Sequence, residues 1–459
     1  MSRQPVSSRR PLAFGLLTLL LAAACSTDTP NAPEAHPQQV IRHSPRLADT
    51  IRMLARHRKI GPLASPRRIR PSLVTLGQAL AFDKELSGNR DISCMTCHLP
   101  AMGTGDGRAL SIGTGATGLG LNRIHPTGLF IPRNAPPAFN LTALDHLFWD
   151  GRVTVDRRGR YHTPAGEKLT RKMTRVFEFG ALSALPLFPV MARDEMRGFG
   201  GNELAAIPDE RMHQIWNGLM DRLGRIPEYR RMFEAAYPGT RFREMTFAHA
   251  SNAIGGFLAA RLSLNNSAWD RFLAGNDRAL NQEQMVGAKA FLSLKCSVCH
   301  NGPAFTDNQF HNVAVAQLGP GKGDGPGGRD DYGRFTIDGN PAMKYAFRTP
   351  SLRNVVLTAP YGHDGAIRDL REFIAHYSES DLKLRAFDPL GLEPLLQGTL
   401  VPNVEEILAT RDTLLQGVVI PDEMVDQLTA FMGALTDDPM QYRGIVPRRV
   451  PSGLPVDNP

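Results

Sequence analysis

The sequence of 459 residues has little of what several protein classes require. It has no basic run interleaved with aromatic residues, and its formal net charge of +8 is modest for this length, so nucleic-acid binding is not indicated. The N-terminal apolar run, residues 12–21, is too short for a membrane-spanning helix. Strand signals are few. The length exceeds that of one small core and fits two domains.

Cysteine is also scarce, and four of the five cysteines follow one pattern, in which two thiols separated by two residues are followed at once by a histidine. The pattern occurs twice, as Cys94, Cys97 and His98, and as Cys296, Cys299 and His300. It is the attachment signature of a c-type haem, since each thiol adds to one vinyl group and the imidazole then lies under the iron. Two disulfides or a tetrathiolate zinc site would need neither histidine. The sequence therefore predicts two covalent haems.

The N-terminal region predicts export. Residues 1–24 are typical of a secretory leader, with arginines before the apolar run and small residues after it. Three alanines precede Cys25, as at a bacterial lipoprotein cleavage site, although ordinary cleavage nearby is the alternative. Residues 25–70 are rich in Pro, Ala, Thr and Arg and are predicted to be a flexible tether. We therefore expect a periplasmic lipoprotein anchored to a bacterial membrane.

The remaining chain is predicted to be mainly α, with few short strands and long loops. Helical patterns cover residues 73–82, 203–236, 243–263, 281–294 and 422–435. The two haem motifs suggest two related cytochrome c-like halves. We expect an N-terminal haem domain over residues 71–275, a C-terminal haem domain over 276–445 and a tail over 446–459.

Several further segments match a known family. They are Leu86-Ser87-Gly88, Phe148-Trp149-Asp150-Gly151-Arg152, Asn301-Gly302-Pro303, Thr349-Pro350-Ser351-Leu352-Arg353-Asn354 and Tyr361-Gly362-His363-Asp364-Gly365. With the haem motifs, they make residues 70–440 resemble the bacterial dihaem cytochrome c peroxidases and the related MauG-like dihaem oxidases of methylamine utilisation. The resemblance implies a first haem that reacts with peroxide, a second haem that accepts electrons from a donor protein, and a calcium ion between them.

The resemblance also bears on the sixth ligand of each iron. Thr114 stands where the peroxidases have a distal histidine, so the first haem is expected to be five-coordinate and open, with His125 as the only nearby substitute. At the second haem the peroxidases use methionine and the MauG-like oxidases use tyrosine. Tyr377 lies on the apolar face of a predicted helix over 367–377, where it could simply fill the core. The resemblance makes it the expected ligand, with Met343 as the alternative.

Three further roles are implied by the resemblance. Glu195 matches the acidic residue that moves a proton between the peroxide oxygens. Asp194 is its alternative, because the family usually has proline and valine directly before the Glu-Met pair, and here residues 192–194 intervene. Trp149 matches the tryptophan that relays charge between the haems. The residues that match the calcium site are Asn134, Thr358 and Pro360. They can offer oxygen atoms, which are the ligands that a hard cation prefers.

The implied function is reduction of hydrogen peroxide with electrons from a donor protein, either a small cytochrome c or a cupredoxin. The first alternative is a MauG-like oxidase that modifies residues of a partner protein. The second is a dihaem electron carrier without enzymatic activity, and the third is a haem-binding surface lipoprotein. A homodimer is compatible with each of these.

Overall fold

A computed structural model describes residues 45–65 and 68–458. The predicted leader, the lipidation of Cys25 and residues 25–44 of the predicted tether lie outside the described residues. Within the described residues, no helix is both long enough and apolar enough to cross a membrane.

The described chain is mainly helical, which confirms the predicted fold class. Before residue 265 the α-helices are α1 (Pro45–His57), α2 (Pro71–Phe82), α3 (Cys94–Cys97), α4 (Arg171–Thr174), α5 (Ala181–Ala184), α6 (Met212–Gly224), α7 (Pro227–Ala236) and α8 (Phe247–Arg261). After it they are α9 (Ala268–Leu273), α10 (Gln282–Ser293), α11 (Cys296–Cys299), α12 (Phe335–Asp338), α13 (Leu370–His376), α14 (Ser380–Arg385), α15 (Pro394–Gln397), α16 (Val404–Ala409), α17 (Asp422–Ala434) and α18 (Met440–Arg443).

The strands are short and form two antiparallel sheets. One sheet has the order β1 (His146–Leu147), β2 (Val153–Val155) and β3 (Tyr161–His162). The other pairs β4 (Phe310–His311) with β5 (Phe347–Arg348). Long loops connect these elements, in line with the predicted fold class.

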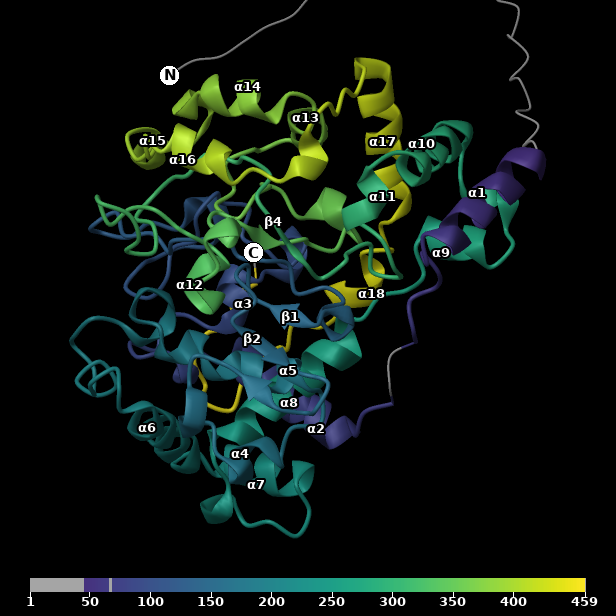
Figure 1. Cartoon of the computed structure of the whole chain (residues 1–459). Helices are drawn as coiled ribbons and strands as arrows, with labels where there is room; N and C mark the ends of the chain where they lie inside the picture. The colour runs from purple at the N-terminus through teal and green to yellow at the C-terminus, as the bar shows by residue number, and fades with distance from the viewer. Residues whose placement is uncertain (1–44, 66–67, 459) are drawn as a thin grey trace, which may run out of the picture. The chain divides into compact units, whose positions relative to one another are not determined.

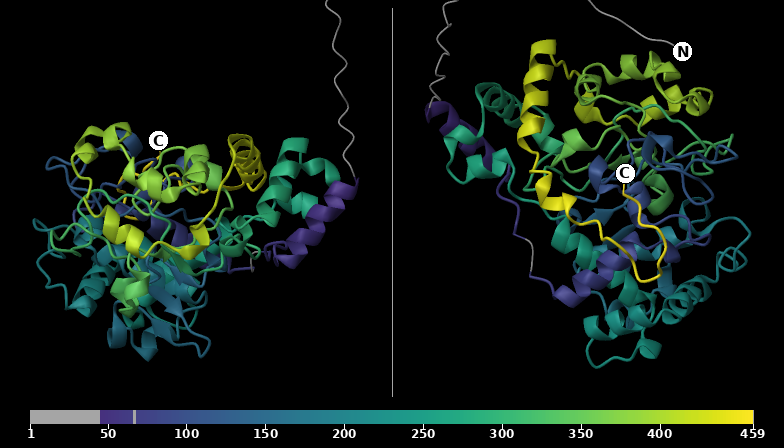
Figure 2. Two further views of the ribbon diagram at one scale, coloured as in Figure 1. Left: turned by 45° about the horizontal axis from the view of Figure 1, so that its top comes forward. Right: turned by 180° about the vertical axis from the view of Figure 1, so that it is seen from behind.

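One helix pair packs closely in each half of the chain. In the first half α2 packs on α8, and in the second half α10 packs on α17 (Figures 1 and 2). Glycine permits both contacts, because a Cβ atom added to Gly77 would lie 1.8 Å from the backbone oxygen of Ala253, and one added to Gly287 would lie 1.9 Å from that of Gln427. The first helix of each pair precedes a haem motif along the chain and so helps to fix its position.

Part of the segment predicted to be a flexible tether is a packed helix. α1 lies against α10 and buries Ile51 completely, together with neighbouring small apolar side chains. The guanidinium of Arg52 donates to the backbone oxygen of Phe272 at 3.0 Å and also pairs with Asp277. The apolar residues of α1 recur at helical spacing, and this periodicity outweighs the polar composition on which the tether prediction relied.

The buried apolar side chains form separate clusters. The largest draws its members from residues 73–264 together with Tyr442, Ile445 and Val450, and the next draws them from residues 269–435 together with residues 48–60. A smaller cluster joins residues 109–130 of the first half to residues 315–396 of the second. The predicted domain boundary at residue 275 stays a prediction; the largest cluster ends at Leu264 and the next begins, on this side, at Trp269.

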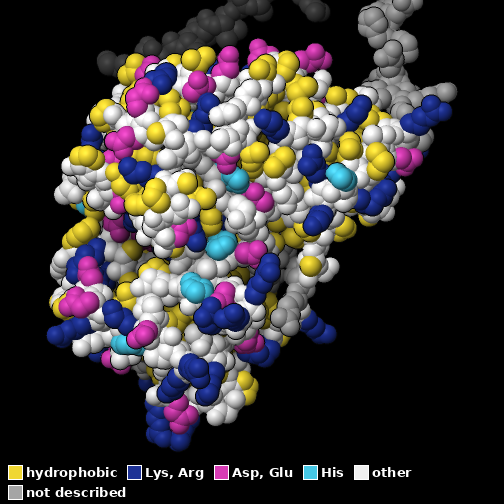
Figure 3. Space-filling model, in the orientation of Figure 1, with side chains coloured by type: hydrophobic (Ala, Val, Ile, Leu, Met, Phe, Trp, Pro, Cys, Tyr) yellow, Lys and Arg dark blue, Asp and Glu magenta, His cyan; other side chains and the backbone are white. Residues whose placement is uncertain are grey.

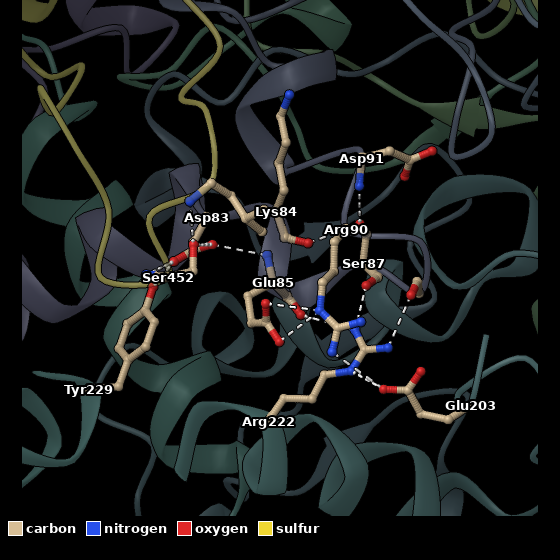
Figure 4. A network of polar contacts seen from close by, with 12 residues as sticks. Asp83, Lys84, Glu85, Ser87, Arg90, Asp91, Glu203, Arg222, Tyr229 and Ser452 are labelled. Carbon is tan, nitrogen blue, oxygen red and sulfur yellow. Dashed lines mark hydrogen bonds and ion pairs between the residues drawn. The ribbon is translucent and has the colours of Figure 1, made fainter. Parts of the chain in front are cut away.

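The C-terminal segment, predicted to be a tail, is bonded to the first half of the chain. The hydroxyl of Ser452 donates to the buried carboxylate of Asp83 at 2.6 Å, and the hydroxyl of Tyr229 donates to the same carboxylate at 2.6 Å (Figure 4). Asp457 pairs with Lys84 at 2.6 Å and accepts a hydrogen bond from Thr96, which lies inside the first haem motif. The end of the chain thus supports the first haem motif.

The close packing at Gly287 gives a stability prediction. Alanine normally stabilises a helix interior by about 1 kcal/mol relative to glycine. Here the added methyl group would meet the α17 backbone, so Gly287→Ala should destabilise the protein by about 1–3 kcal/mol. Denaturant unfolding would measure this. Gly433→Ala is the matched control, because nothing lies within 4 Å of its Cβ position; equal effects of the two variants would contradict the prediction.

Candidate functional site

The first haem motif forms one helical turn, α3, with His98 directly after it, and both thiols and the histidine line the same cavity. The backbone N–H of Ser93 donates to the hydroxyl of Thr96 at 2.9 Å, and this contact fixes the start of the turn. The Nδ1 atom of His98 lies 3.0 Å from the backbone oxygen of Thr104. A hydrogen bond from Nδ1 leaves Nε2 as the metal-binding nitrogen. Burial lowers the pKa of His98, which favours the neutral imidazole that a metal requires.

The second motif repeats this arrangement. α11 carries Cys296 and Cys299, and the Nδ1 atom of His300 lies 3.0 Å from the backbone oxygen of Phe305. Burial lowers the pKa of His300 as well. Each histidine is therefore held by a backbone carbonyl a few residues further along the chain, with Nε2 left for a metal ion.

Each motif lies in the wall of its own cavity. The first cavity is lined by Cys94, Cys97 and His98. The second cavity is lined by Cys296 and Cys299 of α11 and by His300. All four thiols are free of disulfides. The two donor sets, each in the wall of a cavity, fit two covalently attached haems.

Neither Thr114 nor His125, the one candidate for a distal ligand, lines the first cavity. Thr114 is buried, and its hydroxyl donates to Asp91 at 2.7 Å and accepts from Asn89 at 3.0 Å. His125 packs beside Gly115, outside the cavity wall. Among the described residues that line this cavity, His98 is the only histidine. The arrangement is compatible with the predicted open iron.

Of the two candidate ligands at the second haem, Tyr377 lines the cavity and Met343 does not. Tyr377 directly follows α13, and its ring packs edge-on against Phe373, with centroids 5.6 Å apart. Burial raises the pKa of Tyr377, so the phenol stays protonated unless a cation stabilises the phenolate. His376, next to it, instead faces the backbone oxygen of Val313 at 2.8 Å.

Glu195 rather than Asp194 faces the first cavity. Both belong to a π-helical turn, Arg193–Arg197, in which the N–H groups of Met196 and Arg197 converge on the backbone oxygen of Ala192. The extra residues in this segment are thus accommodated as a widened turn that still directs Glu195 inward. Burial raises the pKa of Glu195, and the nearby charge of Asp194 raises it further. The carboxyl group is therefore suited to hold a proton.

Trp149 lies in the wall that the two cavities share. It lines both of them, is only 8 % exposed, and its indole N–H donates to the backbone oxygen of Asn134 at 2.9 Å. Its own backbone oxygen accepts from the N–H of Arg348 at 2.8 Å. These bonds fix the indole between the two sites.

The residues predicted to bind calcium converge on the second cavity. Asn134, Thr358 and Pro360 all line it, although more than 200 positions of sequence separate the first from the other two. The side-chain amide of Asn134 donates to the backbone oxygens of Arg108 and Ala109 at 2.9 and 3.3 Å, which orients its oxygen atom. The cation itself stays a prediction.

The walls of the two cavities also hold several cations that were not predicted from the sequence. Arg133 is held between Asp331 and Asp150, each at 2.6 Å, and lines the first cavity. Lys322, from the glycine-rich loop of the second half, also lines the first cavity, while Arg348 lines both. No local pattern marks them, because their place depends on how the two halves pack.

The fold and the paired cavities define a helical protein with two c-type haem sites. Residues 71–278 match the family described as dihaem cytochrome c peroxidase. The chain thus resembles the dihaem cytochrome c peroxidase and MauG family. This family carries two c-type haems, for which the two motifs of this chain offer the thiols.

Curated relatives extend the likeness over both halves. The methylamine utilization protein MauG of Methylorubrum extorquens is 28% identical over 69% of this chain and 70% of its own length. The cytochrome c551 peroxidase of Pseudomonas aeruginosa is 29% identical over 67% of this chain and 72% of its own length.

Two solved structures share the fold. One, a MauG-like protein associated with microbial copper homeostasis, has a TM-score of 0.58 at 24% identity and covers 83% of this chain and 96% of its own. The other is the dihaem peroxidase BthA from Burkholderia thailandensis, with a TM-score of 0.57 at 22% identity and coverage of 87% and 94%.

The assignment of the thiols has a direct test. Cys94→Ala should remove one covalent haem and Cys296→Ala the other, because each variant lacks one of the two thioether bonds of its site. Haem content by the pyridine haemochrome assay measures this. Cys25→Ser, outside both motifs, should keep two haems. Retention of two haems by either motif variant would refute the assignment.

A second prediction concerns Tyr377. Since phenolate is an anionic donor to iron, Tyr377→Phe should change the absorption and electron paramagnetic resonance spectra of the second haem while haem content stays intact. Met343→Leu is the control and should leave both spectra unchanged. The reverse pattern would assign the ligand to Met343.

Proposed function

We propose that this protein reduces hydrogen peroxide to water with electrons from a donor protein, a small cytochrome c or a cupredoxin, in the bacterial periplasm. One peroxide takes up two electrons and two protons and gives two water molecules. When bound, the haems supply the iron that reacts with peroxide and exchanges electrons. The observation that carries the proposal is the half-buried Glu195, whose side chain lies in the wall of the first cavity together with His98.

Glu195 supplies proton transfer in this proposal. Cleavage of the peroxide O–O bond requires a proton to move from the near oxygen to the far one, and a carboxyl group within reach of both can carry it. The raised pKa of Glu195 supports this role, because a carboxyl with a pKa closer to neutrality both releases and accepts a proton more readily. Trp149, in the wall common to both cavities, is the proposed relay between the two sites.

A second candidate function is MauG-like oxidation of residues in a partner protein. Tyr377 favours it, because the resemblance associates tyrosine at this place with the oxidases, and Tyr377 lines the second cavity whereas Met343 does not.

For either function, we propose that Asn134, Thr358 and Pro360 hold a calcium ion and that Cys25 carries the lipid anchor. On the face in Figure 3, Lys and Arg are interspersed with Asp and Glu. An electron-donor protein that approached this face would therefore meet charges of both signs.

Peroxide consumption tests the proposal. With a reduced small cytochrome or cupredoxin as donor, wild-type protein should turn over, and Glu195→Gln should lower kcat/KM by about 100-fold or more at unchanged haem content. The control Asp194→Asn should lower the rate far less than Glu195→Gln, because the Asp194 side chain does not line the cavity and acts only through the pKa of Glu195. Turnover only in the presence of a partner protein that becomes oxidised would favour the second candidate. A wild-type rate in Glu195→Gln would exclude Glu195 as the proton carrier.

A further inference from the structure

The wall between the two cavities contains a buried cation with no counter-ion. Arg348, in β5, is 5% exposed and lines both cavities. Its Nη1 donates to the backbone oxygen of Thr349 at 3.0 Å, and Nε makes a longer bond of 3.4 Å to that of Phe148. In the described part of the chain, Nη2 has no acceptor, and no carboxylate forms an ion pair with this guanidinium.

Other buried arginines differ from Arg348. Arg133 and Arg353 each pair with buried aspartates. Arg123 lacks such a partner, but its three nitrogens donate to three backbone oxygens, and it lines neither cavity. Arg348 therefore combines burial, an unused donor nitrogen and contact with two cavities.

An unpaired buried charge is costly. The effective penalty for removing one ion from water is several kcal/mol even after relaxation. Burial alone lowers the pKa of Arg348 to about 10, with no carboxylate to oppose the shift. Guanidinium forms its strongest hydrogen bonds with carboxylates, in a forked geometry that lysine lacks. The missing counter-ion is therefore expected to be a carboxylate that enters a cavity.

We propose that Arg348 binds a carboxylate side chain of a haem held in one of these cavities. A c-type haem carries two such carboxylates, and the chain's own carboxylates leave Arg348 unpaired. The inference rests on the presence of two haems and not on peroxide reduction, so it survives if the proposed activity fails.

This contact has an electrochemical consequence. A positive charge beside a haem favours the reduced state, which is one unit more negative, so Arg348 raises the midpoint potential of the haem that it contacts. It also keeps the carboxylate ionised, so that the potential changes little with pH. Loss of the guanidinium should reverse both effects.

Spectroelectrochemical titration of the holoprotein at several pH values from 5 to 8 tests the proposal. Arg348→Gln should lower the midpoint potential of one haem by about 59 mV, equivalent to a tenfold change in its reduction equilibrium, and should make that potential depend on pH. Which of the two potentials moves identifies the cavity that supplies the carboxylate. Arg348→Lys keeps the charge and should retain most of the wild-type potential.

Two controls separate charge from structure. Arg152→Gln removes a cation of the first cavity that Asp150 already neutralises, and Lys295→Gln removes an exposed cation of the second. Both should shift the potentials less than Arg348→Gln. Unchanged potentials in a haem-replete Arg348→Gln would overturn the proposal. If that variant fails to retain haem, Arg348→Lys decides: retained haem with pH-independent potentials supports the proposal, and haem loss or a new pH dependence overturns it.

Discussion

The structure depends on one shared wall. The indole of Trp149 is fixed by its hydrogen bond to the backbone of Asn134, and the backbone of Arg348 bonds to Trp149 from the other half of the chain. Because these three residues line both cavities, the two haem sites cannot be positioned independently. A displacement of this wall would alter the proposed relay, the predicted calcium site and the electrostatics of both sites together.

Both halves of the chain have the same helix packing in front of the haem motif. A helix carrying a glycine packs directly on a partner backbone, and the chain then leads to a one-turn haem motif whose histidine is oriented by a backbone carbonyl. The two halves differ in the side chains that line their cavities. The first cavity presents Glu195 and no second histidine among the described residues, whereas the second presents Tyr377. Common scaffolding thus supports two chemically different sites.

Local sequence signals predicted the elements better than their connections. Helical periodicity placed α2, α8, α10 and α17 to within a few residues, because burial of one face imposes a 3.6-residue period. At α1 the composition led to a wrong prediction of a flexible tether, because its polar average does not show the apolar residues that recur on one face of the helix. The final residues, predicted to be a simple tail, bond to Asp83 and Lys84, a long-range contact that no local pattern encodes.

The sequence by itself was enough to predict the two haem attachment sites, because covalent attachment requires thiols and a histidine at fixed spacing. It also ranked Tyr377 over Met343 and Glu195 over Asp194, though only through resemblance. Tertiary structure alone decided which of these side chains face a cavity. It also revealed the cations Lys322 and Arg348, since a cavity wall is assembled from segments that are distant in sequence and its charge balance depends on three-dimensional packing.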